Sequence, residues 1–215
     1  MIVCMTKVLI LAAGSATRWG NYKGTPKHKL IIENEILIER ACRQFSEYTK
    51  DIVIVSNEES TVKEIETYNP PFDKKWKDIA KFWSSREIWG QGRTIMVFAD
   101  VYFTDEAVKK IMDDKSDFSF YLRSKGSEIT GKPFKEIWGI GFNINRASML
   151  SSVITSIIES KENYSIGGWH LHSHLIDNKY EFNTVEINDW TEDFDFPKDL
   201  ETWLEQRNNF VQGVQ

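Results

Sequence analysis

The feature that most constrains the fold is a strongly apolar segment near the start of the chain, residues 7–13, which ends at Gly14. Apolar side chains at consecutive positions leave no polar face, so a strand formed here must be covered on both sides. Two further segments of this kind span residues 51–56 and 94–99, and the second of them ends at Asp100. Three such strands predict a central, mostly parallel sheet covered by helices.

Helical patterns follow the first two predicted strands. Residues 36–48 place Leu37, Ala41 and Phe45 at four-residue spacing, which puts these side chains on one face of an amphipathic helix. Residues 58–68 predict a second helix. The alternation of strand and helix predicts parallel strands joined by right-handed crossovers.

The rest of the chain continues this alternation without an internal repeat, a low-complexity tract or a long linker. Further strands are expected at residues 118–123, 136–144 and 182–187, and further helices at residues 104–112, 147–159 and 198–206. We therefore expect one α/β domain over residues 1–215, of the Rossmann-like class with three layers and a mostly parallel sheet. The tail after Asn208 is expected to fray.

Composition and charge exclude several classes of function. The 215 residues carry a formal net charge of −5, whereas a general nucleic-acid binder shows a basic excess. Cys4 and Cys42 are too few for a disulfide framework and favour a reducing compartment. The first apolar segment is too short to span a membrane and lacks a signal-peptide pattern. We expect a cytoplasmic protein with no nucleic-acid and no membrane partner, and we leave a homodimer open.

The first informative motif follows the first predicted strand and reads Leu11-Ala12-Ala13-Gly14-Ser15-Ala16-Thr17-Arg18, with Pro26-Lys27 after it. Small side chains let backbone N–H groups approach an anion, and Arg18 and Lys27 can neutralise phosphate charge. The motif is neither a Walker A loop nor a G-x-G-x-x-G loop. From the residue types alone, a plain strand-to-loop turn with solvated cations is an equally good interpretation.

Two acidic motifs lie further along the chain. Asp100 ends a buried strand, where open α/β sheets bind ligands and where a carboxylate is a natural Mg²⁺ ligand. Asp193 and Asp195 alternate, so they share a face of an extended segment. A helix-capping role for Asp100 and an acidic helix start at residues 193–199 are the alternatives.

Together these motifs resemble the signature of the nucleotidyltransferase superfamily, L-A-A-G-x-x-x-R followed by P-K. The superfamily includes sugar-1-phosphate nucleotidylyltransferases, molybdenum-cofactor guanylyltransferases and cytidylyltransferases. Ala99-Asp100 stands where the family has Gly-Asp, and residues 195–200 resemble its D-T-P-E-D-L segment, with Phe196 in place of Thr. The resemblance implies a GT-A-like fold with Mg²⁺ on Asp100 and Asp195 and with Arg18 and Lys27 as catalytic cations. It also implies a set of residues around the NTP: Leu11, Ala12, Ala13, Gly14, Ser15, Arg18 and Lys27.

The reaction implied by the resemblance is transfer of NMP from an NTP to a small phosphorylated acceptor, such as a sugar or alditol phosphate, with release of pyrophosphate. CTP or UTP is favoured by analogy. Family members contact the acceptor with the middle of the chain, which makes Arg123, Lys132 and Glu136 candidate acceptor contacts. The alternative is a GT-A-type glycosyltransferase, which would also use Asp100 but has no pyrophosphate leaving group for Arg18 and Lys27 to clamp. A nucleotide-binding protein without activity is a third class.

The alternating histidines His170, His172 and His174 are ambiguous. All three would share a face in a strand, whereas only His170 and His174 would do so in a helix. A Zn²⁺ site, acceptor contact and a packing role are all open, although no carboxylate or cysteine stands nearby at a ligand spacing.

Overall fold

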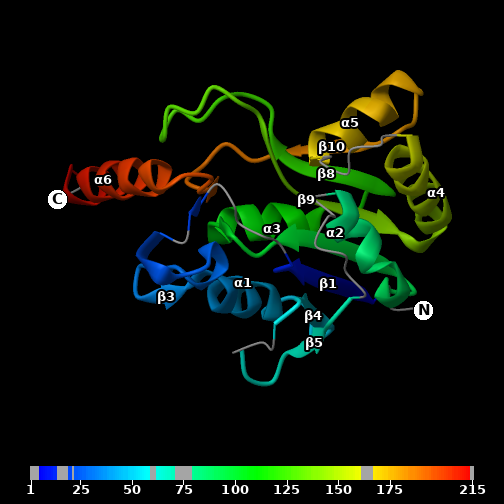
Figure 1. Cartoon of the computed structure of the whole chain (residues 1–215), viewed down its shortest axis with the longest axis horizontal. Coiled ribbons are helices and arrows are strands. Elements are labelled where there is room, and N and C mark those ends of the chain that lie inside the picture. The colour runs from blue at the N-terminus through cyan, green and yellow to red at the C-terminus, as the bar shows by residue number, and fades with distance from the viewer. Residues whose placement is uncertain are drawn as a thin grey trace.

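One seven-stranded sheet runs through the molecule, in the order β10-β8-β9-β6-β1-β4-β5 (Figure 1). The computed structural model describes residues 5–13, 19–20, 22–58, 62–70, 79–160 and 167–213. The strands of the sheet are β1 (Thr6–Leu11), β4 (Ile52–Val55), β5 (Glu66–Tyr68), β6 (Arg93–Phe98), β8 (Phe118–Arg123), β9 (Glu136–Asn143) and β10 (Asn183–Glu186).

The sheet is mostly parallel, as the apolar segments predict. β1 lies between β6 and β4 and is parallel to both, β5 is parallel to β4, and β10 is parallel to β8. β9 is antiparallel to both of its neighbours, β6 and β8. Because β8 therefore runs in the same direction as β6, both strands end at the same edge of the sheet as β1.

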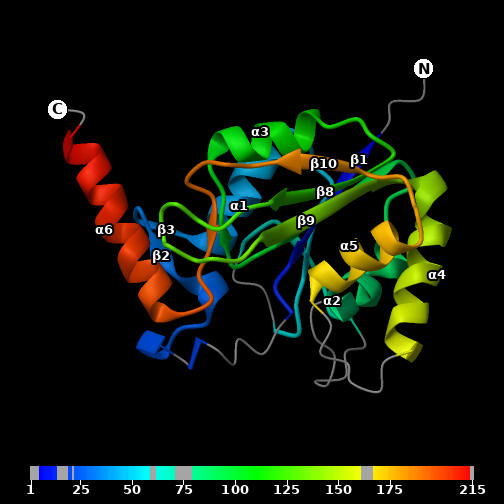
Figure 2. The same ribbon diagram turned by 90° about the horizontal axis from the view of Figure 1, so that it is seen from above.

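Helices cover both faces of the sheet. They are α1 (Leu37–Ser46), α2 (Ile79–Ser84), α3 (Asp105–Asp113), α4 (Ile144–Ser160) and α5 (Gly168–Asp177), whereas α6 (Pro197–Gly213) packs in a separate apolar cluster through Leu200 and Trp203. Val8 and Ile10 of β1 pack in one core with α1 and α3, whereas Leu9 and Leu11 pack in a second core with α2, α4 and α5. Figure 2 shows these two helix layers on opposite sides of the sheet. The three-layer α/β/α architecture is therefore confirmed.

The start of α3 illustrates how the local sequence sets an element boundary. The Thr104 side chain accepts a 3.0 Å hydrogen bond from the Ala107 N–H, and Asp105 and Glu106 occupy the first turn. A capping hydroxyl satisfies a backbone donor that has no partner within the helix, and acidic side chains interact favourably with the positive end of the helix dipole at its start.

Some predicted elements differ from those observed. The helix predicted for residues 58–68 is wrong: β5 ends this segment, beside β4, and Glu64 has a φ of 68°, which a helix does not accommodate. The frayed tail is also corrected, because α6 continues to Gly213. Phe210 packs against Trp190 with ring centroids 5.4 Å apart, which supports the extra turns.

Several short elements gather beside the sheet edge at which β1, β6 and β8 end. They are η2 (Tyr22–Gly24), η3 (Lys27–Lys29), the hairpin β2 (Ile31–Ile32) and β3 (Glu35–Ile36), and the antiparallel pair β7 (Val101–Tyr102) and β11 (Glu192–Asp193). Another short element, η4 (Arg86–Ile88), lies between α2 and β6 in the chain instead. At the edge, a third apolar cluster joins the hairpin to α6 through Ile32, Leu37, Tyr102 and Trp203. This cluster fixes the last part of the chain beside the first.

Two further observations bear on the sequence-based expectations. Within the described ranges, no helix has the length and apolar character needed to cross a membrane. Cys42 is buried and carries a free thiol, and burial raises its pKa to about 12. Cys4 lies outside the described residues.

Candidate active site

The carboxyl end of β6 places Asp100 at the sheet edge. β7 follows directly, and its pairing with β11 sets Asp193 opposite Val101. A 3.0 Å hydrogen bond from the Ala99 N–H to the Leu11 carbonyl ties the end of β6 to the end of β1. The two acidic motifs, which lie about 90 residues apart in the sequence, therefore meet through one short strand pair.

Lys27 lies at the centre of these carboxylates. Its Nζ is 2.8 Å from Asp100 Oδ2 and 3.1 Å from Asp193 Oδ1, and Asp195 Oδ1 is 3.8 Å from the same nitrogen. Pro26 has a φ of −59°, which its ring imposes, and leads the chain into η3, which carries Lys27. The alternation of Asp193 and Asp195 predicted that they share a face, and both side chains indeed turn toward Lys27.

The electrostatics of the group follow from its excess of negative charge. Burial alone would lower the pKa of Lys27, but Asp100, Asp193 and Asp195 outweigh that effect and hold the pKa well above its usual value. Burial would raise the pKa of Asp100, but the positive charge of Lys27 holds it far below its usual value. Burial and the neighbouring carboxylates raise the pKa of Asp193 to about 6. Lys27 therefore stays charged throughout the working pH range.

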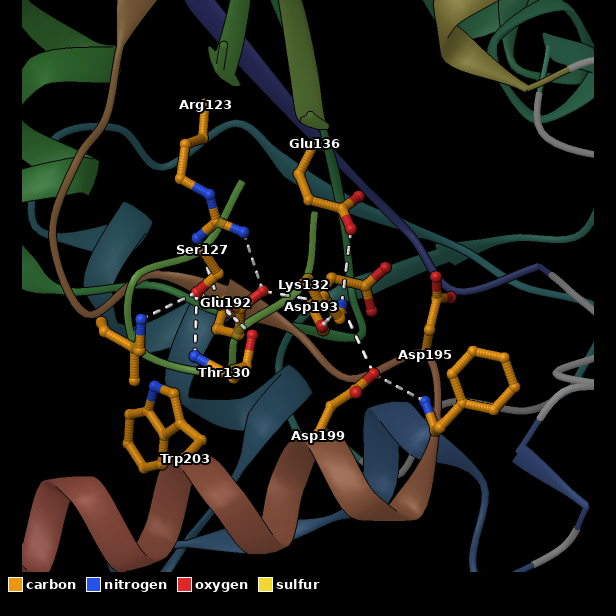
Figure 3. Close-up of polar contacts among 12 residues, drawn as sticks. Arg123, Ser127, Thr130, Lys132, Glu136, Glu192, Asp193, Asp195, Asp199 and Trp203 are labelled. Atoms are coloured by element: carbon orange, nitrogen blue, oxygen red, sulfur yellow. Dashed lines mark hydrogen bonds and ion pairs between the residues drawn. The ribbon is translucent and has the colours of Figure 1, made fainter. Parts of the chain in front are cut away.

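A second set of polar contacts lies behind this group, centred on Glu192 (Figure 3). The Arg123 guanidinium donates two hydrogen bonds of 3.1 Å to the two carboxylate oxygens of Glu192. Ser127 and Thr130 donate to the same carboxylate at 2.6 and 3.3 Å. Glu192 is 0% exposed, so all of these contacts are made away from water.

Lys132 joins both sets of contacts. Its Nζ lies 3.4 Å from Glu136, 3.6 Å from Glu192 and 3.5 Å from Asp199, and it donates a hydrogen bond to the Asp193 backbone carbonyl. Burial and the charge of Asp193 raise the pKa of Glu136 to about 8, although Lys132 is close. One ammonium group thus links the start of β9, β11 and the start of α6.

The predicted site residues fall into four groups. Lys27, Asp100 and Asp195 come together as described. Arg123, Lys132 and Glu136 also lie together beside Asp193, but the two cations are bonded to carboxylates of the protein itself. Leu11 ends β1 at the same edge, and Ala12 and Ala13 follow it directly. Gly14, Ser15 and Arg18 lie outside the described residues, and so do their predicted contacts with the NTP.

The histidine triplet lies in a helix, α5, on the face of the sheet that α4 also covers. His172 packs among three aromatic rings, those of Phe120, Trp169 and Phe182, with centroids 5.0–5.2 Å away. His172 therefore packs within an aromatic cluster.

Sequence reasoning missed the role of Glu192. The signal was present in the alternation, because residues that alternate with those facing Lys27 point to the opposite side of an extended segment. Glu192 and Phe194 do so, and both are fully buried. Its partner Arg123 lies 69 residues away in the sequence, so the pair is visible only in three dimensions.

Comparison with known families shows which proteins the chain resembles. Residues 8–78 match the family model of the MobA-like NTP transferase domain, a range that contains most of β1 as well as Lys27. The resemblance inferred from the motifs is confirmed, and the enzyme class that it indicates is that of the nucleotidyltransferases. No curated protein is significantly similar to the chain in sequence.

Solved structures share the fold over almost the whole chain. A putative glucose-1-phosphate thymidylyltransferase from Bacillus anthracis has a TM-score of 0.67 and 15% identity, covering 94% of this chain and 95% of its own. A CTP:phosphocholine cytidylyltransferase from Streptococcus pneumoniae has a TM-score of 0.64 and 17% identity, covering 94% and 98%. The inositol-1-phosphate CTP transferase from T. maritima has a TM-score of 0.65 and 14% identity, covering 95% and 97%. At these identities the likeness establishes the fold.

Proposed function

We propose that this chain transfers a nucleoside monophosphate from an NTP to a small phosphorylated acceptor and releases pyrophosphate. The observation that carries the proposal is the meeting of Lys27 with Asp100 and Asp195. The sequence motifs single out these three residues for phosphate and metal binding, and they come from three distant segments of the chain. Since these segments include the first and last parts of the chain, the catalytic unit is proposed to be the whole chain, acting as one domain.

The carboxylates around Lys27 fit a Mg²⁺ ion that binds together with substrate phosphates. Mg²⁺ commonly takes one or two carboxylates, several waters and phosphate oxygens. Asp100 and Asp195 offer two carboxylates around one point, whereas the described residues contain no group of three or more His, Cys, Asp or Glu side chains that could hold a metal. Asp100 and Asp195 would hold the ion, which when bound supplies positive charge at the triphosphate.

The side chains of the protein then have to orient the substrates and offset charge. An acceptor phosphate oxygen forms a bond to the α-phosphorus, the bond to the bridging oxygen breaks, and pyrophosphate leaves with the electron pair. Lys27 remains an ammonium throughout and can stabilise the growing negative charge. Such chemistry needs no covalent intermediate, so holding the reactants in line is the main catalytic task.

The proposed substrates are CTP or UTP and a sugar or alditol phosphate. The names of the three neighbouring structures specify thymidylyl or cytidylyl transfer, and glucose 1-phosphate, phosphocholine and inositol 1-phosphate are all small phosphate monoesters. Among the three predicted acceptor contacts, Glu136 has the most exposed side chain, at 14%. Arg123 and Lys132 are almost fully buried and paired within the protein, so Glu136 is the proposed direct contact.

The test is a matrix of pyrophosphate-release assays with Mg²⁺. Each of four NTPs is incubated with glucose 1-phosphate, phosphocholine, inositol 1-phosphate and glycerol 3-phosphate, and the nucleotide-linked product is identified by mass spectrometry. We expect release of pyrophosphate only when a pyrimidine NTP and one of the acceptors are both present.

A parallel incubation distinguishes the proposed nucleotidyl transfer from the glycosyltransferase alternative. UDP-glucose and CMP- or GDP-linked sugars are offered with hydroxyl acceptors, and nucleotide release is measured. Release from a nucleotide-sugar, together with no turnover of any NTP, would replace the proposed function with sugar transfer.

A further inference from the structure

Glu192 uses its full hydrogen-bonding capacity inside the protein. A carboxylate offers about four acceptor positions. Arg123 Nη1 and Nη2, Ser127 Oγ and Thr130 Oγ1 donate to them at 3.1, 3.1, 2.6 and 3.3 Å. A saturated, fully buried carboxylate has no position left for a metal or a substrate, although Asp193 follows it directly in the chain.

The partners of Glu192 all belong to one segment or to its base. Ser127 and Thr130 lie in the β8–β9 loop, residues 124–135, and Arg123 is the last residue of β8. Within the loop, the Ser127 Oγ accepts hydrogen bonds from the N–H groups of Ile129 and Thr130 at 3.3 and 3.1 Å. Glu192 therefore fixes the loop through the hydroxyl that also organises its turn.

The same segment reaches the candidate catalytic group from behind. Lys132 in the loop donates to the Asp193 backbone carbonyl, while the Asp193 side chain accepts a hydrogen bond from Lys27. The loop and the acidic segment thus hold each other at Glu192 and again at Lys132. Figure 3 shows Arg123, Ser127 and Thr130 converging on Glu192, with Lys132 between Glu192 and Asp199.

We infer that Glu192 is a positioning residue: it clamps the β8–β9 loop to the Asp193–Asp195 segment and so shapes the acceptor side of the site, without touching a substrate. The inference rests on the proposed function. In the sheet, β9 and β6 separate β8 from β1, which ends beneath the proposed NTP position. A loosened clamp should therefore disturb the acceptor more than the NTP.

The first experiment measures the clamp without relying on activity. Hydrogen–deuterium exchange is compared between the wild-type protein, Glu192→Gln and the milder Ser127→Ala. We expect amides of residues 129–132 to exchange roughly tenfold faster or more in both variants, as the loss of hydrogen bonds to a charged group implies, while β8 stays protected. Unchanged exchange in the loop of both variants would overturn the inference.

Matched controls distinguish a clamp from a general loss of stability. Ser85→Ala removes another buried serine hydroxyl, directly after α2, and Asp114→Asn breaks another buried arginine pair. Neither should speed exchange in residues 129–132. Where Glu192→Gln fails to fold, Ser127→Ala and Ser85→Ala decide the question by themselves.

The kinetic experiment tests the functional half of the inference. We expect Ser127→Ala to raise the KM for the acceptor roughly tenfold, with the KM for the NTP within about twofold of the wild-type value. Equal changes in both KM values, or no change alongside faster loop exchange, would make the clamp purely structural. If the wild-type protein turns over no NTP, the proposed function fails, and the exchange experiment still decides whether Glu192 holds the loop.

Discussion

Two buried arginine–carboxylate pairs lie at opposite edges of the same sheet and have opposite electrostatic surroundings. Arg93 begins β6 and contacts Asp114 at 2.6 Å, while Arg123 ends β8 and contacts Glu192 at 3.1 Å. The arginine of each pair is less than a tenth exposed. Their surroundings therefore differ in charge balance rather than in burial.

The pair at the start of β6 is balanced. Arg93 also donates to Asn143 at 3.3 Å and to Tyr121 at 3.2 Å, which are neutral groups. Burial would raise the pKa of Asp114, but hydrogen bonds, the Ser116 N–H among them, and the charge of Arg93 hold it below its usual value. One anion and one cation satisfy each other here.

The pair at the end of β8 belongs to a cluster with surplus negative charge. The ion pairs that run through Lys27, Lys132 and Arg123 join these three cations to six carboxylates. Burial, together with the neighbouring carboxylates, raises the pKa of Asp193 to about 6 and that of Glu136 to about 8. Arg93 and Asp114 balance each other's charge, whereas the surplus cluster would be balanced by the proposed Mg²⁺. The Arg93–Asp114 pair therefore stabilises the fold, whereas the Arg123–Glu192 pair belongs to the candidate site.

The largest expected effect is on catalysis at the surplus cluster. Asp100→Asn should lower kcat by at least about 10²-fold, because it removes one of two proposed metal carboxylates. The variant should still fold, because Lys27 keeps Asp193 and Asp195 as charged partners. Pyrophosphate release measures kcat, and thermal unfolding shows whether the variant folds. Near-wild-type turnover at saturating Mg²⁺ would remove Asp100 from the metal site.

The next effect should be on stability at the balanced pair. Asp114→Asn leaves the buried Arg93 charge without its partner, which costs about 3–5 kcal/mol of unfolding free energy. Below the melting transition, kcat should stay within about twofold of the wild-type value. Urea unfolding gives the free energy, and kcat is measured on the same preparation. A variant that keeps its stability but loses turnover would break the comparison.

The sequence predicts what is local and misses what pairs distant segments. A strand made of consecutive apolar residues, as in β1, β4 and β6, has to be buried on both faces. These strands and the layered fold were therefore predictable. The direction of β9 was not, because periodicity identifies a strand without naming its neighbours. The helix wrongly predicted for residues 58–68 shows the same limit, since pairing with β4 outweighs a weak local preference.

The candidate site divides in the same way. Lys27 and Asp100 belong to short motifs with recognisable chemistry, so their types and positions were enough to select them. Arg123 and Lys132 were selected as acceptor contacts because they are cations in the middle of the chain. Their pairing with Glu192 depends on the β7–β11 contact, which no local pattern contains. A cation selected from the sequence as a substrate contact can therefore be a buried structural partner of a carboxylate that no motif singles out.

The smallest expected effect is on the pH dependence of stability, which tests the surplus of negative charge around Glu136. An ionised Glu136 is disfavoured in the folded protein, since its pKa is about 8 there against an ordinary value of 4.5. The folded state then binds more protons than the unfolded state, so this contribution to stability is complete below pH 4.5 and is lost as the pH rises toward 8. The glutamine side chain of Glu136→Gln cannot ionise, so the stability of this variant should not show this loss.

The measurement is the difference in unfolding free energy between Glu136→Gln and the wild-type protein, in EDTA, at pH 6 and pH 8. We expect the variant to gain about 2 kcal/mol relative to the wild-type protein over this interval, because one proton is taken up on folding over most of it. Asp114→Asn is the control: Asp114, with a lowered pKa, is ionised in both states above pH 6, so its difference from the wild-type protein should be the same at both values. A pH-independent difference for Glu136→Gln would mean that Lys132 already balances Glu136, and the cluster would then lack the surplus that sets it apart from the Arg93 pair.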